Sequence, residues 1–215
     1  MDAARIAELL QPFGPPLGDA QLQYISIYID ILRRWNARIN LTAVRKPEEI
    51  VTRHFGESLF AGARLFPRDS ALSGKPQVVD VGSGAGFPGL PIKIWAPQIQ
   101  LTLIESNQKK ATFLREIGRS LRLTDVNVFA GRAEDFPAAG ADVVTLRAVE
   151  RFAAALPTAA RLVRTSGRIA LLVGKGQINC AKELAPGFAW DEPISVPQSS
   201  SRVLLIGKRT AEESG

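Results

Sequence analysis

The chain has 215 residues, of which 46% are hydrophobic and 22% charged, and it contains one cysteine. One cysteine excludes an intramolecular disulfide framework, the N-terminus has no signal-peptide pattern, and no apolar run approaches the roughly 20 residues of a membrane span, so we expect a soluble cytoplasmic protein. The length suits one well-cored domain with an appendage, and the net charge of +6, with arginine as 19 of the 27 cations, favours a polyanionic partner such as nucleic acid, although genome composition alone can produce such a bias.

The N-terminal part of the chain is predicted to be helical. Apolar residues recur at three- and four-residue steps over residues 19–40, which is typical of an amphipathic helix, and Asp19 can cap its start. A further helix is expected over residues 47–66. Basic residues on the polar sides of these helices are either a solvated face or an RNA contact: Arg33, Arg34, Arg38, Arg53 and His54.

After a break at Gly74, Lys75 and Pro76, strands and helices alternate. We expect an N-terminal helical extension of residues 1–74 packed on the core, a main domain of residues 75–209 and a tail of residues 210–215. Strands are predicted at 77–81, 100–105, 125–130, 141–146 and 167–173, and helices at 89–95, 107–121 and 149–163. This alternation predicts a mostly parallel sheet with helices on both faces.

The segment VVDVGSGAGFPG, residues 78–89, is the most informative one. An apolar run that closes on Asp80 predicts a buried strand, and Gly82 and Gly84 after it predict a tight turn that a ligand can approach closely. The next strand ends in Glu105, whose carboxylate can accept hydrogen bonds from both hydroxyls of a ribose.

The glycine turn by itself does not name its ligand. Gly84, Gly86 and Gly89 meet the G-x-G-x-x-G spacing of dinucleotide binders. The run VVDVGSGAG, however, resembles the first motif of S-adenosylmethionine-dependent methyltransferases. Both ligands carry a ribose, so Glu105 supports either one. The segment as a whole favours a methyltransferase and leaves NAD binding and a purely structural turn open.

The end of the chain departs from the alternating pattern. Residues 188–196 and 202–208 are predicted as two strands joined by a polar turn, which is typical of an antiparallel hairpin. The expected fold is therefore α/β and Rossmann-like, with a mostly parallel seven-stranded sheet and a C-terminal antiparallel hairpin. This arrangement is similar to class I methyltransferases, whereas NAD-binding domains usually lack the hairpin.

Few side chains are suited to acid–base or covalent chemistry. Cys180 lies outside the strand-end position where a nucleophilic thiol would act, and a single histidine without a cysteine partner predicts no metal site. Guanine N7 carries a lone pair and no proton, so its methylation needs chiefly alignment of the reactants. We therefore expect no general base and favour a ring nitrogen as the acceptor, although a small-molecule methyltransferase would show the same pattern.

Several motifs in order resemble the small-subunit ribosomal RNA methyltransferase G family, also called glucose-inhibited division protein B. They lie within residues 19–208 and comprise Trp35-Asn36, Asn40-Leu41-Thr42, Arg53-His54, Glu57-Ser58-Leu59, DVGSGAGFPGLP at 80–91, Glu105-Ser106, Lys109-Lys110, Phe113-Leu114, GRAEDF at 131–136, Leu146-Arg147-Ala148 and Lys175-Gly176. The resemblance implies a monomer that uses S-adenosylmethionine to methylate guanine N7 at family position 527 of 16S ribosomal RNA, within the 30S subunit or an assembly intermediate.

The resemblance also implies roles for single residues. Together with the glycine-turn analysis, it places cofactor contacts at Asp80, Gly82, Gly84, Phe87, Glu105, Ala133, Glu134 and Arg147. It places RNA or guanine contacts at Asn40, Arg53, His54, Arg132 and Lys175. Other interpretations exist for some of them, because Phe87 could belong to the core, Glu134 could cap a helix and His54 could be structural.

Two other classes of protein are weighed against this one. An NAD-dependent oxidoreductase fits the glycine turn but requires a proton relay, such as tyrosine with lysine, that Tyr24 and Tyr28 do not supply. A non-catalytic RNA-binding module fits the basic charge but leaves the glycine turn, Glu105 and Arg147 unexplained.

Overall fold

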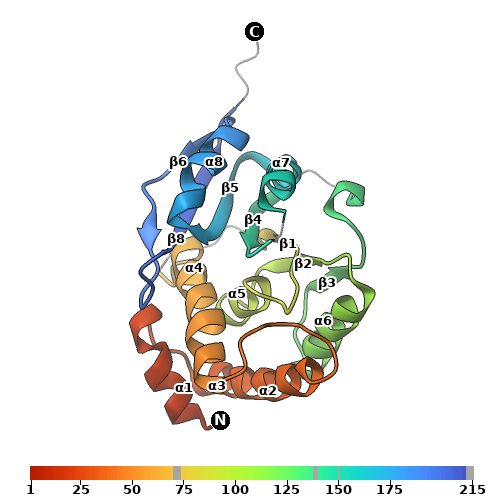
Figure 1. The fold of residues 1–215 in the computed structure, drawn as a ribbon, viewed down its shortest axis with the longest axis vertical. Coiled ribbons are helices and arrows are strands. Elements are labelled where there is room, and N and C mark those ends of the chain that lie inside the picture. Colours follow the sequence, from red (N-terminus) through yellow and green to blue (C-terminus); the bar gives the residue numbers. More distant parts are fainter. Residues whose placement is uncertain (70–73, 138–139, 150, 212–215) are drawn as a thin grey trace.

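A computed structural model of the protein describes residues 1–69, 74–137, 140–149 and 151–211 (Figure 1). Its centre is an eight-stranded sheet in the order β3-β2-β1-β4-β5-β8-β6, with β7 also pairing with β8. Strands β1 to β5 are parallel, and β8 runs antiparallel to β5, β6 and β7. The strands are β1 (Gln77–Val81), β2 (Gln100–Ile104), β3 (Val126–Phe129), β4 (Ala141–Arg147), β5 (Val163–Gly174), β6 (Phe188–Trp190), β7 (Ile194–Ser195) and β8 (Arg202–Arg209).

The strand order reverses at β1. The chain passes from β1 to β2 and β3 on one side and then crosses to β4 on the other. Val81 lies opposite Ile104 of β2 and Leu146 of β4, so the three strands end at the same level. In open parallel sheets, ligands bind outside the carboxyl ends of the strands at such a switch point.

Helices cover both faces of the sheet, as predicted. Alternate strand residues face opposite sides: Val78 belongs to the apolar cluster with α5 (Gly89–Trp95) and α6 (Gln108–Ser120), and Val79 to the cluster with α7 (Phe152–Leu162) and α8 (Ile178–Leu184). Three apolar residues of α6 are fully buried: Phe113, Leu114 and Ile117.

The N-terminal helices pack on the same face as α5 and α6 (Figure 1). They are α1 (Ala3–Leu10), the 3-10 turn η1 (Gln11–Phe13), α2 (Asp19–Asn36), α3 (Pro47–Glu49), the π-helix η2 (Ile50–Gly56) and α4 (Glu57–Leu65). One apolar cluster joins Ile25 and Ile29 of α2 to Ile92 of α5 and Phe113 of α6. The division of the chain at residues 74 and 75 stays a prediction. No helix in the described part of the chain is long and apolar enough to cross a membrane.

The first amphipathic helix is shorter than expected, because it ends at Asn36 rather than at residue 40. The buried Asn36 side chain accepts hydrogen bonds from the amides of Leu41 (2.9 Å) and Thr42 (3.0 Å) and donates one to the Thr42 carbonyl (2.9 Å). These bonds hold residues 37–42 in a turn. The prediction that Asp19 caps the helix is wrong, since Gly18 is the N-cap and Asp19 is the first helical residue.

The second predicted helix, residues 47–66, is helical over residues 47–65, but its middle is the π-helix η2. A π-helix hydrogen-bonds five residues apart, is rare in proteins and is frequent at functional sites. This segment carries Arg53 and His54.

The C-terminal antiparallel hairpin is present, but its first strand is divided into β6 and β7, which makes eight strands where seven were predicted. Trp190 lies opposite Gly207 and Ile194 opposite Leu204, so the three residues 191–193 face two residues of β8. This is a bulge at Pro193, which has no amide N–H for the ladder. Of the predicted tail, residues 212–215 lie outside the described residues.

Candidate active site

A cleft of about 860 Å³ opens at the carboxyl ends of β1, β2 and β4. Its walls come from segments far apart in the sequence: the loop 40–45, His54, the glycine turn 81–87, the end of β2 with the start of α6, the turn 131–134 after β3, and residues 147–149 and 151–158 around the start of α7. The cleft therefore lies at the switch point of the sheet.

The glycine turn exposes main-chain atoms without side chains to the cleft at Gly82 and Gly84, and we refer to these two residues as the glycine floor. The amides of Gly82 and Ser83 donate to the Ile104 carbonyl, both at 3.0 Å, which anchors the turn on the end of β2. Gly82 and Gly84 have φ of +69° and +55°, a region that glycine adopts without strain. A Cβ on Gly84 would meet only the Gly82 carbonyl oxygen, at 3.8 Å, so it would project into the open cleft.

Glu105 stands beside this floor at the end of β2. Its Oε2 accepts a hydrogen bond from the Gly84 amide (2.8 Å), and its Oε1 accepts one from the Asn107 amide (2.7 Å) at the start of α6. The side chain is 7% exposed and lines the cleft. Because each carboxylate oxygen keeps a further lone pair, Glu105 can accept two more hydrogen bonds, as the two hydroxyls of a ribose require.

Asp80 lies beneath the glycine turn and outside the cleft lining. It is fully buried, where its Oδ1 accepts from the Thr145 hydroxyl (2.7 Å) and its Oδ2 from the Gly89 amide (3.4 Å). Burial raises the pKa of Asp80 to about 6, against the opposing effect of these hydrogen bonds. Asp80 thus ties β1, β4 and the start of α5 together below the site.

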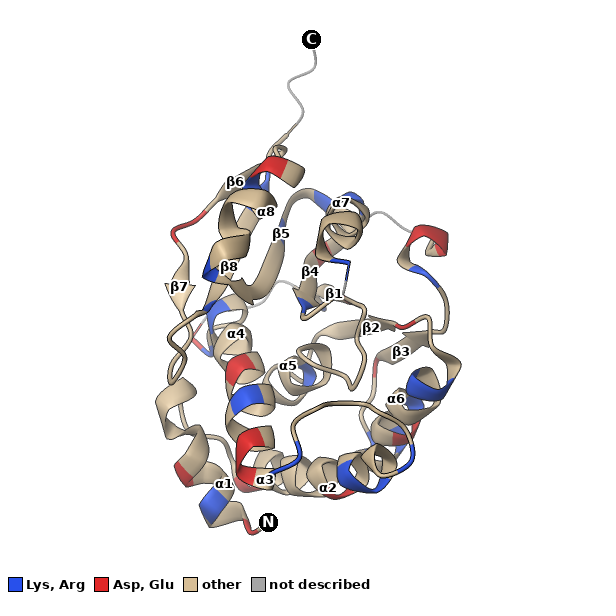
Figure 2. Cartoon of the chain, viewed as in Figure 1, with Lys and Arg blue, Asp and Glu red and all other residues tan. Residues whose placement is uncertain are grey.

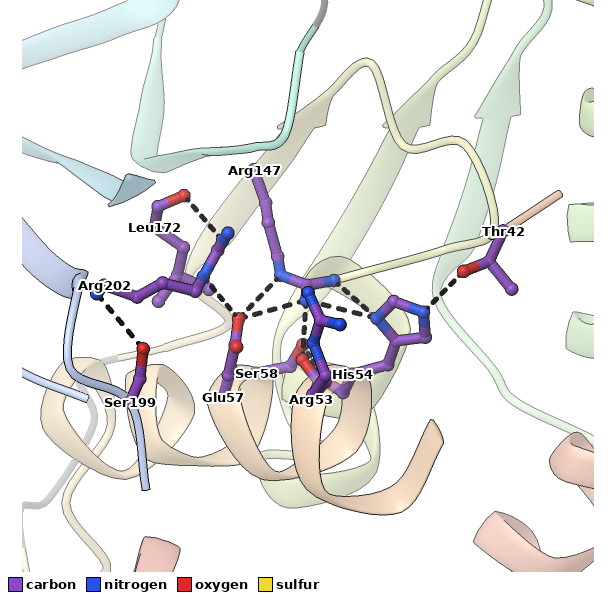
Figure 3. A network of polar contacts seen from close by, with 9 residues as sticks. All are labelled: Thr42, Arg53, His54, Glu57, Ser58, Arg147, Leu172, Ser199 and Arg202. Carbon is purple, nitrogen blue, oxygen red and sulfur yellow. Dashed lines mark hydrogen bonds and ion pairs between the residues drawn. The ribbon is translucent and has the colours of Figure 1, made fainter. Parts of the chain in front are cut away.

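Arg147 ends β4, and its guanidinium points across the cleft wall toward the π-helix (Figure 3). It donates to Glu57 Oε2 from Nη2 (3.0 Å) and Nε (3.3 Å), to His54 Nδ1 from Nη1 and Nη2 (both 3.1 Å), and to the Arg53 carbonyl (2.6 Å). The side chain is 8% exposed. Desolvation lowers the pKa of Arg147, while Glu57 acts in the opposite direction.

The carboxylate of Glu57 forms ion pairs with two arginines. Its Oε2 lies 3.0 Å from Arg147 Nη2 and 3.0 Å from Nε of Arg202, which comes from β8 and also donates to the Leu172 carbonyl (3.2 Å). Glu57 itself is 4% exposed. This carboxylate therefore joins β4, β8 and the helix that begins with it, and we refer to Thr42, His54, Glu57, Arg147 and Arg202 as the buried polar network (Figure 3).

His54 is held as a neutral ring between Arg147 and Thr42. Burial, reinforced by Arg147, Arg53 and Arg202, lowers the pKa of His54 to about 3. Its Nε2 lies 2.7 Å from Thr42 Oγ1, and its ring stacks on Phe87 at 4.8 Å between centroids.

Phe87 is part of an aromatic stack under the cleft. Its ring also stacks on Tyr28 of α2 at 5.5 Å between centroids, and Phe55 meets both rings edge-on. The Tyr28 hydroxyl donates to the Ala85 carbonyl (2.5 Å), and burial raises the pKa of Tyr28 well above its usual range. The N-terminal helices thus support the glycine turn directly.

The structure brings most of the predicted site residues to one cleft: Asn40, His54, Gly82, Gly84, Phe87, Glu105, Arg132, Ala133, Glu134 and Arg147. Three lie outside its lining. Asp80 is below it, the Arg53 side chain is exposed on η2, and Lys175 is exposed on η4 (Lys175–Gln177) just after β5. Among the residues that the structure describes, no group of three metal-ligating side chains is found.

Four polar residues that shape the site had no role predicted for them: Tyr28, Thr42, Glu57 and Arg202. Glu57 had a detectable signal, because a charged residue opens the apolar run ESLFA of a helix. Arg202 had none, since its partner is 145 positions away in the chain.

The switch-point cleft, its glycine floor and Glu105 define a class I S-adenosylmethionine-dependent methyltransferase. Magnesium protoporphyrin IX methyltransferase from Synechocystis PCC 6803 with bound cofactor has the same fold, with a TM-score of 0.65 at 14% identity over 92% of this chain and 100% of that one. The family model of rRNA small subunit methyltransferase G (GidB) matches residues 21–195, and the chain belongs to this family.

Relatives in this family are similar over most of their length. The ribosomal RNA small subunit methyltransferase G of Roseiflexus sp. (strain RS-1) is 37% identical over 213 residues, which cover 93% of this chain and 88% of the relative. The protein of the same name from Stenotrophomonas maltophilia (strain K279a) is 39% identical over 173 residues, 79% of this chain and 78% of the relative.

Proposed function

We propose that this protein transfers a methyl group from S-adenosylmethionine to N7 of a guanine in 16S ribosomal RNA, the guanine at family position 527. The observation that carries the proposal is the switch-point cleft itself, whose glycine floor and Glu105 suit the cofactor and whose other wall comes from the loop 40–45 and His54. Membership of the rRNA methyltransferase family supplies the substrate class.

The residues in the cleft fit S-adenosylmethionine. The open backbone at Gly82 and Gly84 leaves the room that a Cβ would fill, and Glu105 offers free lone pairs to a ribose. Ala133 and Glu134, from the turn after β3, would border the adenine. When bound, the cofactor supplies a methyl group on a positively charged sulfur, which a neutral ring nitrogen can attack without a base.

The ionisable groups of the buried polar network position other residues and do not take up protons. His54 is neutral with both ring nitrogens engaged, and Arg147 is fixed by Glu57, so neither is free to act as a general base. Guanine N7 has no proton to lose. Acceleration would then come from holding the acceptor in line with the methyl group and excluding water.

The rim of the cleft is suited to phosphate. Arg45, Lys110, Arg132 and Arg151 contribute to its lining, and Figure 2 shows further Lys and Arg residues along α6 and α2. Such cations would hold a structured RNA by its backbone. We propose that the protein acts in the cytoplasm as a monomer, on the 30S subunit or an assembly intermediate.

The test is transfer of a radiolabelled methyl group to 30S subunits and to naked 16S rRNA from a strain that lacks this modification, with the product nucleoside identified by mass spectrometry. We expect N7-methylguanosine, and its loss in Gly82→Asp, because that side chain would enter the cleft beside Val149. Absence of label in both RNAs, from a folded protein that binds S-adenosylmethionine, would overturn the rRNA assignment. NADH should cause no thermal shift.

A further inference from the structure

The hydrogen bonds in the buried polar network have a fixed direction. A guanidinium has N–H donors and no acceptor, so His54 Nδ1, which lies 3.1 Å from two nitrogens of Arg147, must accept. The neutral ring then carries its proton on Nε2. Nε2 therefore donates to Thr42 Oγ1 at 2.7 Å.

The oxygen of Thr42 is fully used as an acceptor. Besides the His54 bond, it accepts one from the Val44 amide at 3.1 Å. A hydroxyl has two lone pairs and one proton, so only the O–H of Thr42 is left. Among the residues that the structure describes, Thr42 Oγ1 makes no other hydrogen bond, and Thr42 lines the cleft.

We infer that the Thr42 hydroxyl donates a hydrogen bond to O6 of the target guanine and so orients the base and selects it. This inference rests on the proposed function. The edge of guanine that carries N7 presents two acceptors, N7 and O6. N7 needs its lone pair for the methyl group, which leaves O6 as the acceptor that an oriented donor can hold.

The same geometry discriminates against adenine. Adenine presents an amino group at the position of O6, which is a donor. This amino group would meet the Thr42 hydroxyl, whose lone pairs are already occupied by donors from His54 and Val44. The adenine amino group and the Thr42 O–H would then both be left without an acceptor. Sites that leave a polar group unpaired with the wrong substrate reject it strongly. Arg147 fixes the direction of these hydrogen bonds through His54, because its N–H donors occupy His54 Nδ1 and leave His54 Nε2 to donate toward Thr42.

The test uses 30S subunits reconstituted with 16S rRNA that carries either guanine or 2-aminopurine at the target position. 2-Aminopurine keeps N7 and lacks O6. The quantity measured is kcat/KM for methyl transfer to each RNA by wild type, Thr42→Val and Thr42→Ser, with S-adenosylmethionine affinity and melting temperature measured in parallel.

We expect wild type to methylate guanine roughly 10- to 100-fold faster than 2-aminopurine, which is the effect of leaving one neutral hydrogen-bond donor unpaired. Thr42→Val should reduce transfer to guanine and bring the ratio between the two RNAs close to one, while Thr42→Ser should keep the wild-type ratio. Val cannot accept from His54 or Val44, so it could also disturb the loop, but such damage would slow both RNAs alike and leave the ratio unchanged. Thr42→Cys, a weaker donor, should give an intermediate ratio even if the Val variant does not fold.

A wild-type ratio in Thr42→Val would overturn the role of Thr42 and leave the proposed function intact. Failure of wild type to form N7-methylguanosine on the guanine RNA would instead remove the proposed function, and with it this inference.

Discussion

Replacement of Glu57 by glutamine keeps the size of the side chain and removes its charge. In the folded protein, Glu57 Oε2 lies 3.0 Å from both Arg147 Nη2 and Arg202 Nε, and the three side chains are 5%, 8% and 24% exposed. Glu57→Gln would leave two guanidinium groups without their carboxylate, and it would place an amide that also carries donors against them.

Removal of one partner from a buried ion pair destabilises a protein by about 3–5 kcal/mol. Two features reduce the loss here. Arg147 retains His54 Nδ1 and the Arg53 carbonyl as acceptors, and Arg202 retains the Leu172 carbonyl, although its buried Nε would have no partner. We therefore expect the lower end, about 3 kcal/mol, which corresponds to a fall of roughly 6–12 °C in melting temperature for a chain of this size.

The measurement is urea unfolding followed by circular dichroism, with two control variants. Glu57→Asp keeps the charge with a shorter reach and should lose less. Glu8→Gln removes the carboxylate of an exposed pair, Arg5 to Glu8 at 2.6 Å with side chains 45% and 67% exposed, and should leave the free energy of unfolding nearly unchanged. If Glu57→Gln lost no more than Glu8→Gln, the stabilising role of the buried polar network would be refuted.

Three further predictions concern pH, the cofactor and RNA. The pKa of Asp80 is raised to about 6 in the folded protein, so its contribution to stability is present below about pH 4 and is lost as the pH rises to 6. The pKa of His54 is lowered to about 3, so its contribution is present above pH 6.5 and is lost as the pH falls. The two slopes oppose each other between about pH 4 and 6, so Asp80→Asn should leave a free energy of unfolding that rises with pH by up to about 1.4 kcal/mol per unit; a flat profile from urea titrations would contradict this. Gly84→Val should weaken S-adenosylmethionine binding, measured by calorimetry, by at least about 10-fold, because the added side chain fills the cleft, and it should also lower stability through left-handed strain of about 1–2 kcal/mol; Gly187→Ala, at a position with open space, is the control, and equal affinities would argue against the glycine floor as the cofactor site. Arg132→Ala should reduce the salt slope of RNA binding by about 1 and leave cofactor affinity unchanged, whereas Arg164→Ala, whose side chain pairs with Asp142 (2.7 Å), should leave the slope as it is; an unchanged slope in Arg132→Ala would remove that residue from the RNA contact.

Local patterns in the sequence were sufficient for the core of the fold and for the cofactor side of the cleft. The strands and helices that alternate after residue 75 have periodicities that depend on near neighbours. The positions of Gly82, Gly84 and Glu105 at strand ends follow from the same patterns, and the structure places all three on the cleft.

The irregular features were beyond such patterns. The π-helix at residues 50–56 and the bulge at Pro193 interrupt elements that look regular in the sequence. Asn36 ends a helix through side-chain bonds to residues five and six positions ahead, which compete with continued helix in a way that apolar periodicity does not register.

The sequence by itself therefore determined the class of fold, the glycine turn, Glu105 and the arginine that ends β4, because strand periodicity and glycine conformation act over a few residues. Only the tertiary structure decided where that arginine points. Arg147 meets His54 and Glu57 some 90 positions earlier in the chain, and Arg202 joins them from β8. Long-range contacts of this kind arise when the sheet and the N-terminal helices pack together and bury charges that must then find partners.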